Sequence, residues 1–302
     1  FATVTAGGAR GGAIAFKSTW DTTSSTETVT LPLTNHASFE EIVVDWGDGS
    51  SDTIGAYDDS EKAHEYTDGA NTKTITITGN IYGFKFGNSG DKTKIKTITE
   101  WGNFQLSDQD VFYGCSALTI SADDAPGITT TTFRRMFKGC TALTAVVSDG
   151  SGSGDAWDTS SVTNFTDVFS GCTNFNSSVD HWDVSAGTDF TYMFYAAAAY
   201  NQSMSSWSFK QSGTINMTGM FDGGAVAFNQ DIGNWNTAYV TNMTQMFSGA
   251  SIFNNGGASL TEAGNNWDVQ RVTNMANMFK GSAFNVACGD WNTAAVTTMD
   301  SM

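Results

Sequence analysis

The sequence predicts an α+β protein with two structural parts, a small β-sandwich followed by a solenoid of coils about 25 residues long. Two observations support this prediction. From residue 14 to about residue 98, apolar and polar residues alternate with the period of two that is typical of strands. From residue 99 to the end, one phrase returns at a nearly constant interval, and such repetition indicates stacked copies of a single unit.

Residues 1–13 are rich in glycine and alternate only loosely, so we expect a flexible lead-in, or an arm that pairs with a neighbour. Four segments then have the composition of strands: 27–33, 40–46, 73–79 and 82–86. Each is rich in β-branched or aromatic residues and bounded by turn residues, which predicts an antiparallel β-sandwich over residues 14–98.

Three aspartates cluster at the end of the second of these segments: Asp45, Asp48 and Asp52. Calcium prefers clustered carboxylate oxygens, so these side chains are the candidate metal ligands and calcium is the one candidate cofactor. Their spacing is not that of an EF-hand loop. The alternative is that each aspartate caps the backbone of its own turn.

The same turn carries a motif. Trp-Gly-Asp-Gly at residues 46–49, followed by His64 and Tyr66, resembles the polycystic-kidney-disease-type (PKD) immunoglobulin-like domain. The resemblance implies an immunoglobulin-like sandwich that serves as a spacer or an interaction module.

Residues 235–254, WNTAYVTNMTQMFSGASIFN, are the clearest copy of the repeated phrase. Four of its apolar residues have the spacing of one helical face: Val240, Met243, Met246 and Phe247. Asn242 is a natural N-cap and Gly249 a natural C-terminal stop, so we predict a helix of about two turns. A helix this short is marginal alone and has to pack on its neighbours.

Three side chains recur once per coil and are expected to form columns along the stack. We expect two of the columns, one of tryptophan and one of phenylalanine, to be buried. Their members are Trp157, Trp182, Trp207, Trp235 and Trp267, and Phe169, Phe194, Phe221, Phe247 and Phe279. The third is an asparagine ladder whose amides would bond to adjacent coils: Asn176, Asn201, Asn229, Asn254 and Asn285. The alternative for the ladder is an exposed amide row that touches sugar or ice.

The repeated phrase, W(D/N)T..VTNM..MF.G...FN, resembles the bacterial surface protein A type repeat, a leucine-rich-like repeat also found in mycoplasma lipoproteins. The resemblance is specific from Trp157 onward. It implies a leucine-rich-like α/β solenoid on a secreted or surface-displayed protein, often adhesive, and it carries no catalytic residues. Two longer intervals contain insertions, at residues 146–155 and 254–265, which we expect to bulge as surface loops.

The formal net charge of −17 argues against a nucleic-acid partner. The sequence has no stretch of 18 or more apolar residues, so it does not predict a membrane-spanning helix. Cys115, Cys140 and Cys172 share one repeat position, where a small buried side chain is the simplest interpretation. No nucleophile motif accompanies the three histidines, so we do not expect an enzyme.

These observations predict an extracellular or surface-displayed structural and adhesion protein that binds a protein or a glycan. One alternative is a subunit of a filament or of a phage or virus fibre, with localisation on a virion or appendage. The last copy stops at Met302, before its phenylalanine, so we expect this open end to be covered by further chain or by another subunit. A second alternative is a carbohydrate- or ice-binding module that uses the threonine rows, for example Thr163, Thr241, Thr273 and Thr297.

Overall fold

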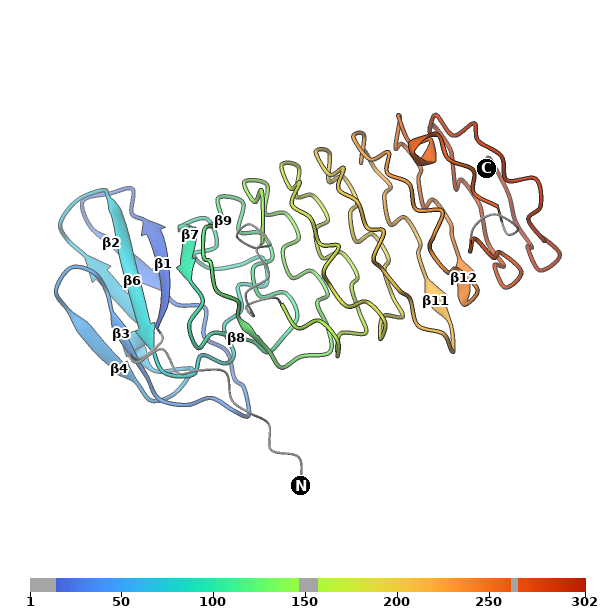
Figure 1. Ribbon diagram of the computed structural model, residues 1–302. Helices are drawn as coiled ribbons and strands as arrows, with labels where there is room; N and C mark the ends of the chain where they lie inside the picture. The colour runs from blue at the N-terminus through green and yellow to red at the C-terminus, as the bar shows by residue number, and fades with distance from the viewer. Residues whose placement is uncertain (1–14, 147–156, 262–265) are drawn as a thin grey trace, which may run out of the picture.

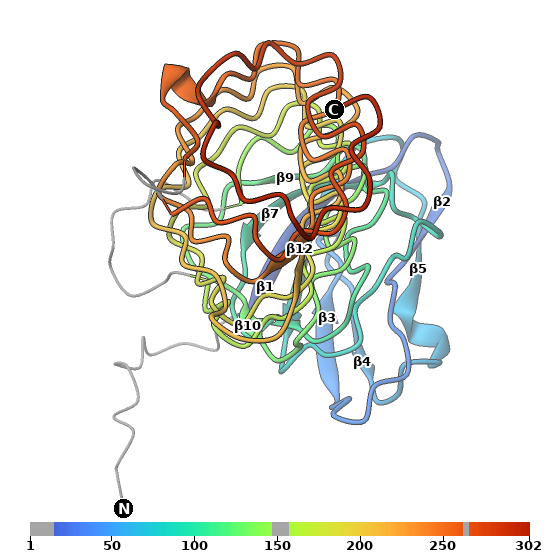
Figure 2. The same cartoon turned by 90° about the vertical axis from the view of Figure 1, so that its right-hand side faces the viewer.

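The computed structural model describes residues 15–146, 157–261 and 266–302. The predicted arm at 1–13 and most of the first predicted insertion lie outside these residues, as does part of the second. Strands gather at one end of an elongated molecule, and the rest of the chain runs as coils stacked one after another (Figure 1). A view turned by 90° shows the coils overlaid around a shared interior (Figure 2).

The N-terminal part contains a six-stranded sheet in the order β4-β3-β6-β1-β7-β9 and a two-stranded sheet of β2 and β5. The strands are β1 (Phe16–Asp21), β2 (Glu27–Thr30), β3 (Ile42–Asp45), β4 (Ser51–Ile54), β5 (Ala63–Tyr66), β6 (Thr72–Thr78), β7 (Ile95–Glu100) and β9 (Thr119–Ile120), with the 3-10 turn η1 (Ser60–Lys62) before β5. Neighbouring strands are antiparallel except β7 and β9, which are parallel. Segment 82–86, predicted as a strand, contributes only an isolated bridge between Phe84 and Leu33.

The large sheet does not stop where the repeats begin. Strand β7 lies before residue 101, whereas its partner β9 belongs to the first coils, and the pair aligns Thr97 with Thr119. Two further short parallel pairs lie along the coils: β8 (Gln105–Leu106) with β10 (Gly127–Ile128), and β11 (Ile215–Asn216) with β12 (Val240–Asn242). One hydrophobic core extends from Phe16 to Met278. The large sheet and the hydrophobic core therefore both continue across the predicted domain boundary between residues 98 and 99. The division into two domains stays a prediction.

The predicted α+β fold class, with its leucine-rich-like α/β solenoid, is wrong. Within the described residues there is no α-helix, and the helical residues are confined to η1 and a second 3-10 turn, η2 (Asn255–Gly257). The segment predicted as a helix in each coil is a chain of tight turns. The described part of the molecule is thus nearly all β-structure and turns.

The physical reason lies in the backbone of each coil. Gln245, in the middle of the predicted helix, has φ of 56°, in the left-handed region that ends a helix. The amide of Phe247 donates to the carbonyl of Met278 in the next coil, at 2.9 Å, instead of to a carbonyl four residues earlier. The amide of Met246 donates to the carbonyl of Met243, three residues earlier, at 3.2 Å, which closes a tight turn. Successive tight turns place apolar residues at the same three-residue interval as one face of a helix. The spacing alone therefore led to the wrong prediction of a helix.

The aromatic side chains fill the interior of the stack. Successive rings of the phenylalanine column, which also includes Phe112 and Phe137, are stacked with centroids 5.5 to 5.9 Å apart. Its members from Phe169 to Phe247 are fully buried, and Phe279 is partly buried. The five tryptophans are at most 3% exposed. Trp157 stacks on Trp182, and Trp207 on Trp235, with centroids 5.9 Å apart in both pairs.

Trp235→Ala is expected to lower the free energy of unfolding by about 3 to 5 kcal/mol, because it leaves a large cavity in the interior. Trp235 is fully buried, and its ring nitrogen donates to the Met204 carbonyl at 3.0 Å. Urea denaturation measures the change. Ile252, 49% exposed, supplies the control, since Ile252→Ala should change stability by less than about 0.5 kcal/mol. Equal effects of the two substitutions would contradict the buried position of Trp235.

Tyr200→Phe is expected to stabilise the protein by about 1 kcal/mol. Tyr200 is fully buried at a position where later coils have Phe228 and Phe253, and its hydroxyl has no hydrogen-bond partner among the described residues. An unsatisfied buried hydroxyl costs free energy that phenylalanine avoids. Thermal melting would register the gain, and a lower melting temperature for the variant would show that the hydroxyl is bonded.

Candidate functional site

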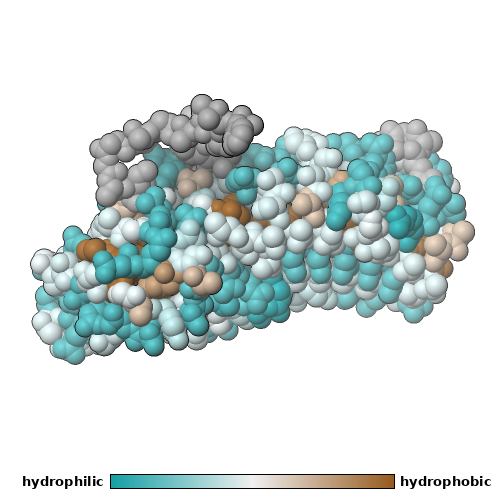
Figure 3. Space-filling view, turned by 90° about the horizontal axis from the view of Figure 1, so that it is seen from below, coloured by the Kyte–Doolittle hydropathy of each residue, from teal (hydrophilic) through white to brown (hydrophobic). Residues whose placement is uncertain are grey.

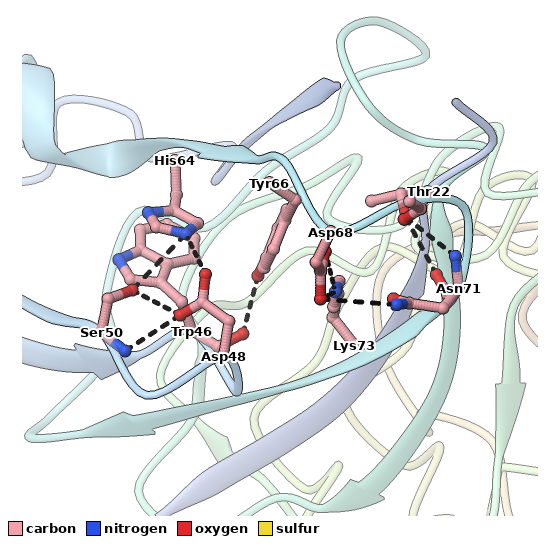
Figure 4. Close-up of polar contacts among 10 residues, drawn as sticks. Thr22, Trp46, Asp48, Ser50, His64, Tyr66, Asp68, Asn71 and Lys73 are labelled. Carbon is pink, nitrogen blue, oxygen red and sulfur yellow. Dashed lines mark hydrogen bonds and ion pairs between the residues drawn. The ribbon is translucent and has the colours of Figure 1, made fainter. Parts of the chain in front are cut away.

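The predicted aspartate cluster lies at the end of β3, where a turn runs through residues 46–50 into β4. Asp48 faces His64 of β5, with Oδ2 2.7 Å from Nε2 (Figure 4). Ser50 donates its hydroxyl to Asp48 at 2.6 Å. The His64 ring stacks on Trp46, with centroids 4.9 Å apart, and the Tyr66 hydroxyl donates to the Trp46 carbonyl at 2.8 Å. These contacts fasten the turn to the smaller sheet.

The cluster brings together a serine, a histidine and an aspartate, but in a geometry unlike that of a catalytic triad. In a triad the aspartate orients one ring nitrogen and the serine bonds to the other. Here Asp48 and Ser50 both face Nε2 of His64, and the serine oxygen is 3.5 Å away. Since the Ser50 hydroxyl bonds to the carboxylate at 2.6 Å, the histidine is not placed to take its proton.

Each predicted calcium ligand is engaged in local hydrogen bonding. Asp45 accepts from the amide of Gly47 at 2.9 Å, and Asp52 accepts from the ring nitrogen of Trp46 at 2.8 Å. Across residues 15–146, 157–261 and 266–302, no group of three or more histidine, cysteine, aspartate or glutamate side chains could hold a metal ion. The geometry favours the turn-capping alternative for Asp45 and for Asp48, which accepts the Ser50 amide at 2.9 Å, whereas Asp52 bonds to a side chain. Calcium binding stays a prediction.

The five predicted ladder asparagines form a continuous chain of bonds from coil to coil. In each step the amide of one asparagine donates to the side-chain oxygen of the asparagine one coil earlier. The four steps are Asn201 to Asn176 at 2.9 Å, Asn229 to Asn201 at 3.0 Å, Asn254 to Asn229 at 2.7 Å and Asn285 to Asn254 at 2.6 Å. These side-chain oxygens replace the backbone carbonyls that an ordinary sheet would supply.

The threonine row has its hydroxyls turned toward the neighbouring coil. Each hydroxyl donates to a backbone carbonyl of the preceding coil: Thr163 to Thr131 at 3.2 Å, Thr241 to Ile215 at 3.4 Å, Thr273 to Thr241 at 3.1 Å and Thr297 to Thr273 at 2.9 Å. The hydroxyl protons are therefore already donated within the stack. This leaves the row fewer donors for a sugar or for ice.

The three cysteines that share a repeat position are buried and free. Cys140 donates its thiol to the Phe112 carbonyl at 3.1 Å, and Cys172 to the Phe137 carbonyl at 3.0 Å. Burial raises the pKa of Cys172 to about 12, so its thiol stays protonated and unreactive at neutral pH.

Sequence reasoning assigned Asn242 a capping role, as the N-cap of a helix, but it missed the same polar contact at Asp189 and Asn216. In most coils an Asn or Asp at this repeat position accepts the amide two residues later, as Asn242 does from Thr244 at 2.9 Å and Asp189 from Thr191 at 3.0 Å. This contact starts the tight turns. The exchange of Asn for Asp at one repeat position was a signal for it, because both have the oxygen that such a turn requires.

Asn229→Ala is expected to cost about 1 to 3 kcal/mol of stability, because the Asn229 side-chain oxygen accepts two backbone amides. These are the amides of Asn254 at 2.7 Å and Gly256 at 3.0 Å. Asn229→Asp keeps the acceptor and should cost less. Chemical denaturation of the two variants compares them, and an alanine variant as stable as the aspartate variant would contradict a bonding role for the ladder.

Stability should fall on acidification as Asp48 becomes protonated. Burial opposes its ionisation, but hydrogen bonds from Ser50 and His64 outweigh burial and lower the pKa of Asp48 from 3.8 to about 2. A carboxylate with a lowered folded-state pKa stabilises the protein above its unfolded pKa and loses that effect as the pH falls through the folded pKa. The loss therefore occurs between about pH 4 and pH 2.

Denaturation midpoints measured from pH 6 to pH 2 test this expectation in Asp48→Asn and in a control, Glu41→Gln, which removes the same charge from an exposed position. The Asp48 variant should show a smaller decline below about pH 4 than the wild type. The same decline in all three proteins would exclude Asp48 as its source.

In the described part of the chain, no helix combines the length and the apolar character needed to cross a membrane. No curated protein and no solved structure is significantly similar to the sequence. The sequence does match the family described as "Mycoplasma protein of unknown function, DUF285" over residues 107–223 and 256–302, all within the coils. Because these two ranges make up more than half of the chain, the protein belongs to this family.

Proposed function

We propose that this protein is an extracellular or surface-displayed structural and adhesion protein, whose stacked coils carry an acidic surface that binds a protein partner. The proposal rests on one observation. The side chains that recur in every coil are used to hold the coils to one another, through ring stacking and the asparagine and threonine bonds described above. At partly exposed positions the coils differ in charge and size, as where Tyr195 corresponds to Ser248 and Lys280.

A stack of this kind is suited to display. Its length grows with the number of coils, and substitutions on its outer surface leave the interior unchanged. Seen from below, hydrophilic and neutral residues lie in regular rows along the coils, with few apolar ones between them (Figure 3). The net charge of −17 favours a partner with basic groups, because opposite charges speed association and suppress wrong partners.

The resemblance to the bacterial surface protein A type repeat supports the same proposal, and membership of the mycoplasma family is compatible with it. The resemblance of residues 46–66 to a PKD-type domain supports a spacer role for the N-terminal part. We favour a protein partner over sugar or ice because the threonine hydroxyls already donate to neighbouring coils.

Binding arrays test this function. The protein is applied to a panel of immobilised extracellular proteins and to a glycan array, together with variants that carry alanine at outward positions on successive coils. We expect saturable, salt-sensitive binding that is lost in variants of one contiguous patch. Absence of binding on both arrays, or the formation of polymers at micromolar concentration seen by electron microscopy, would contradict it. Polymers would instead favour the filament subunit.

A further inference from the structure

Two positions in the tight turns of each coil follow one another along the stack. The first is the left-handed residue in the middle of the turns, occupied in successive coils by Asp110, Arg135, Asp167, Tyr192, Gly219, Gln245 and Asn277. The second lies three residues later: Tyr113, Lys138, Ser170, Tyr195, Asp222, Ser248 and Lys280. We call these two rows the outer face.

At its N-terminal end, the outer face satisfies its own charges. The Arg135 guanidinium lies over the Tyr113 ring, 5.2 Å from its centroid, and donates two bonds to Asp110 at 2.7 and 2.8 Å. Asp110 is only 5% exposed, so this arginine neutralises a buried carboxylate. Lys138 pairs with Asp167 at 2.9 Å in the same way.

Further along, at Tyr192, Tyr195 and Asp222, the outer face has two tyrosines and a carboxylate, and its next basic residue is Lys280, two coils after Asp222. Tyr195 occupies the position of Tyr113, and the residue that corresponds to Arg135 in the next coil is Gly219. A side chain there would collide with the Tyr192 ring, since an added Cβ would lie 2.2 Å from it, and the Tyr195 ring fills the space beside Gly223 in the same manner. The two rings meet edge to face, 5.5 Å apart, and Tyr195 is 39% exposed.

The nearby carboxylate has no counterion. Asp222 lies one coil after Tyr195, with its backbone carbonyl accepting the Ala196 amide at 2.9 Å. It is 9% exposed, and its side chain accepts the amide of Gly223 at 2.6 Å. None of the ion pairs formed by the described residues includes Asp222, and no basic residue occupies either row in the adjacent coils. Buried charges are normally paired, and Asp222 has only the hydrogen bond from Gly223 in place of an ion pair.

We propose that Tyr192, Tyr195 and Asp222 form a receptor for an arginine side chain of the protein partner. Its guanidinium would lie on the exposed part of the Tyr195 ring, beside Asp222 of the next coil, and would combine a tyrosine face with a carboxylate as Arg135 does with Tyr113 and Asp110. This inference rests on the proposed function, and it specifies that the protein partner presents an arginine side chain. The same combination occurs in the N-terminal part, where Lys73 lies 4.8 Å from the Tyr66 centroid while paired with Asp68. Arg271 lies 4.9 Å from the Tyr239 centroid, which is a cation over a tyrosine face without a carboxylate ion pair. Cations over tyrosine faces are attracted by the ring electrons, and a carboxylate adds to the attraction.

The test is fluorine NMR of protein labelled with 3-fluorotyrosine, titrated with N-acetyl-arginine amide. The Tyr192 and Tyr195 resonances, assigned by Tyr→Phe substitution, should shift saturably. Tyr113 and Tyr239 already carry arginines of the chain, so their resonances should stay in place. The uncharged N-acetyl-glutamine amide should give no shift at any tyrosine.

Asp222→Asn keeps the acceptor for Gly223 and removes the charge, so it should weaken arginine binding by about fivefold. Asp268→Asn is the matched control, because it removes the same charge at a position where Asn236 and Asn292 stand in other coils, and its affinity should equal that of the wild type. Unmoved Tyr195 resonances, equal weakening by both variants, or shifts produced only by a neutral sugar such as maltose would overturn the proposal. If this test fails while the arrays show saturable binding, the receptor is wrong and the proposed function stands.

Discussion

The stack of coils depends on hydrogen bonds between successive coils. A single coil of about 25 residues cannot offset its own ordering entropy, because its aromatic side chains become buried only when neighbouring coils pack against them. The coil gains stability by donating its amides to the next coil, as Phe169 does to Met193 and Phe221 to Met246, both at 2.9 Å. The same phenylalanines carry the stacked rings of the interior. The coil-to-coil hydrogen bonds and the ring stacking therefore require the same alignment of neighbouring coils.

That constraint separates the residues that can vary from those that cannot. An inward ring, a ladder asparagine or a turn-starting Asn or Asp has a neighbour in each adjacent coil, so a change there disturbs two contacts. An exposed residue such as Tyr195 makes fewer contacts with other coils, and it can differ from coil to coil without loss of the stack. Specific binding by such a molecule is therefore expected to come from the outer positions, and the strongly acidic composition indicates the sign of charge on its partner.

The repeat interval, and with it the side chains that recur in each coil, could be read from the sequence. The backbone between them could not. Val240, Met243, Met246 and Phe247 have the spacing of a helix, and nothing in that spacing distinguishes a helix from successive tight turns. The deciding facts are the left-handed φ of Gln245 and the amide bonds to another coil, which are properties of the stack. Likewise, the Asp48–His64 contact joins residues 16 positions apart, and only the pairing of β2 with β5 and the turn after β3 bring them together.

Amide hydrogen exchange tests the central claim most directly, because exchange is slow only where an amide is bonded and opens rarely. If coil-to-coil bonds hold the fold, the amides of Phe169, Phe194, Phe221 and Phe247 should be among the most protected in the protein. They should lose that protection together when one central coil is destabilised. Rapid exchange of these four amides in the intact protein, at the rate of an unstructured turn, would contradict the account.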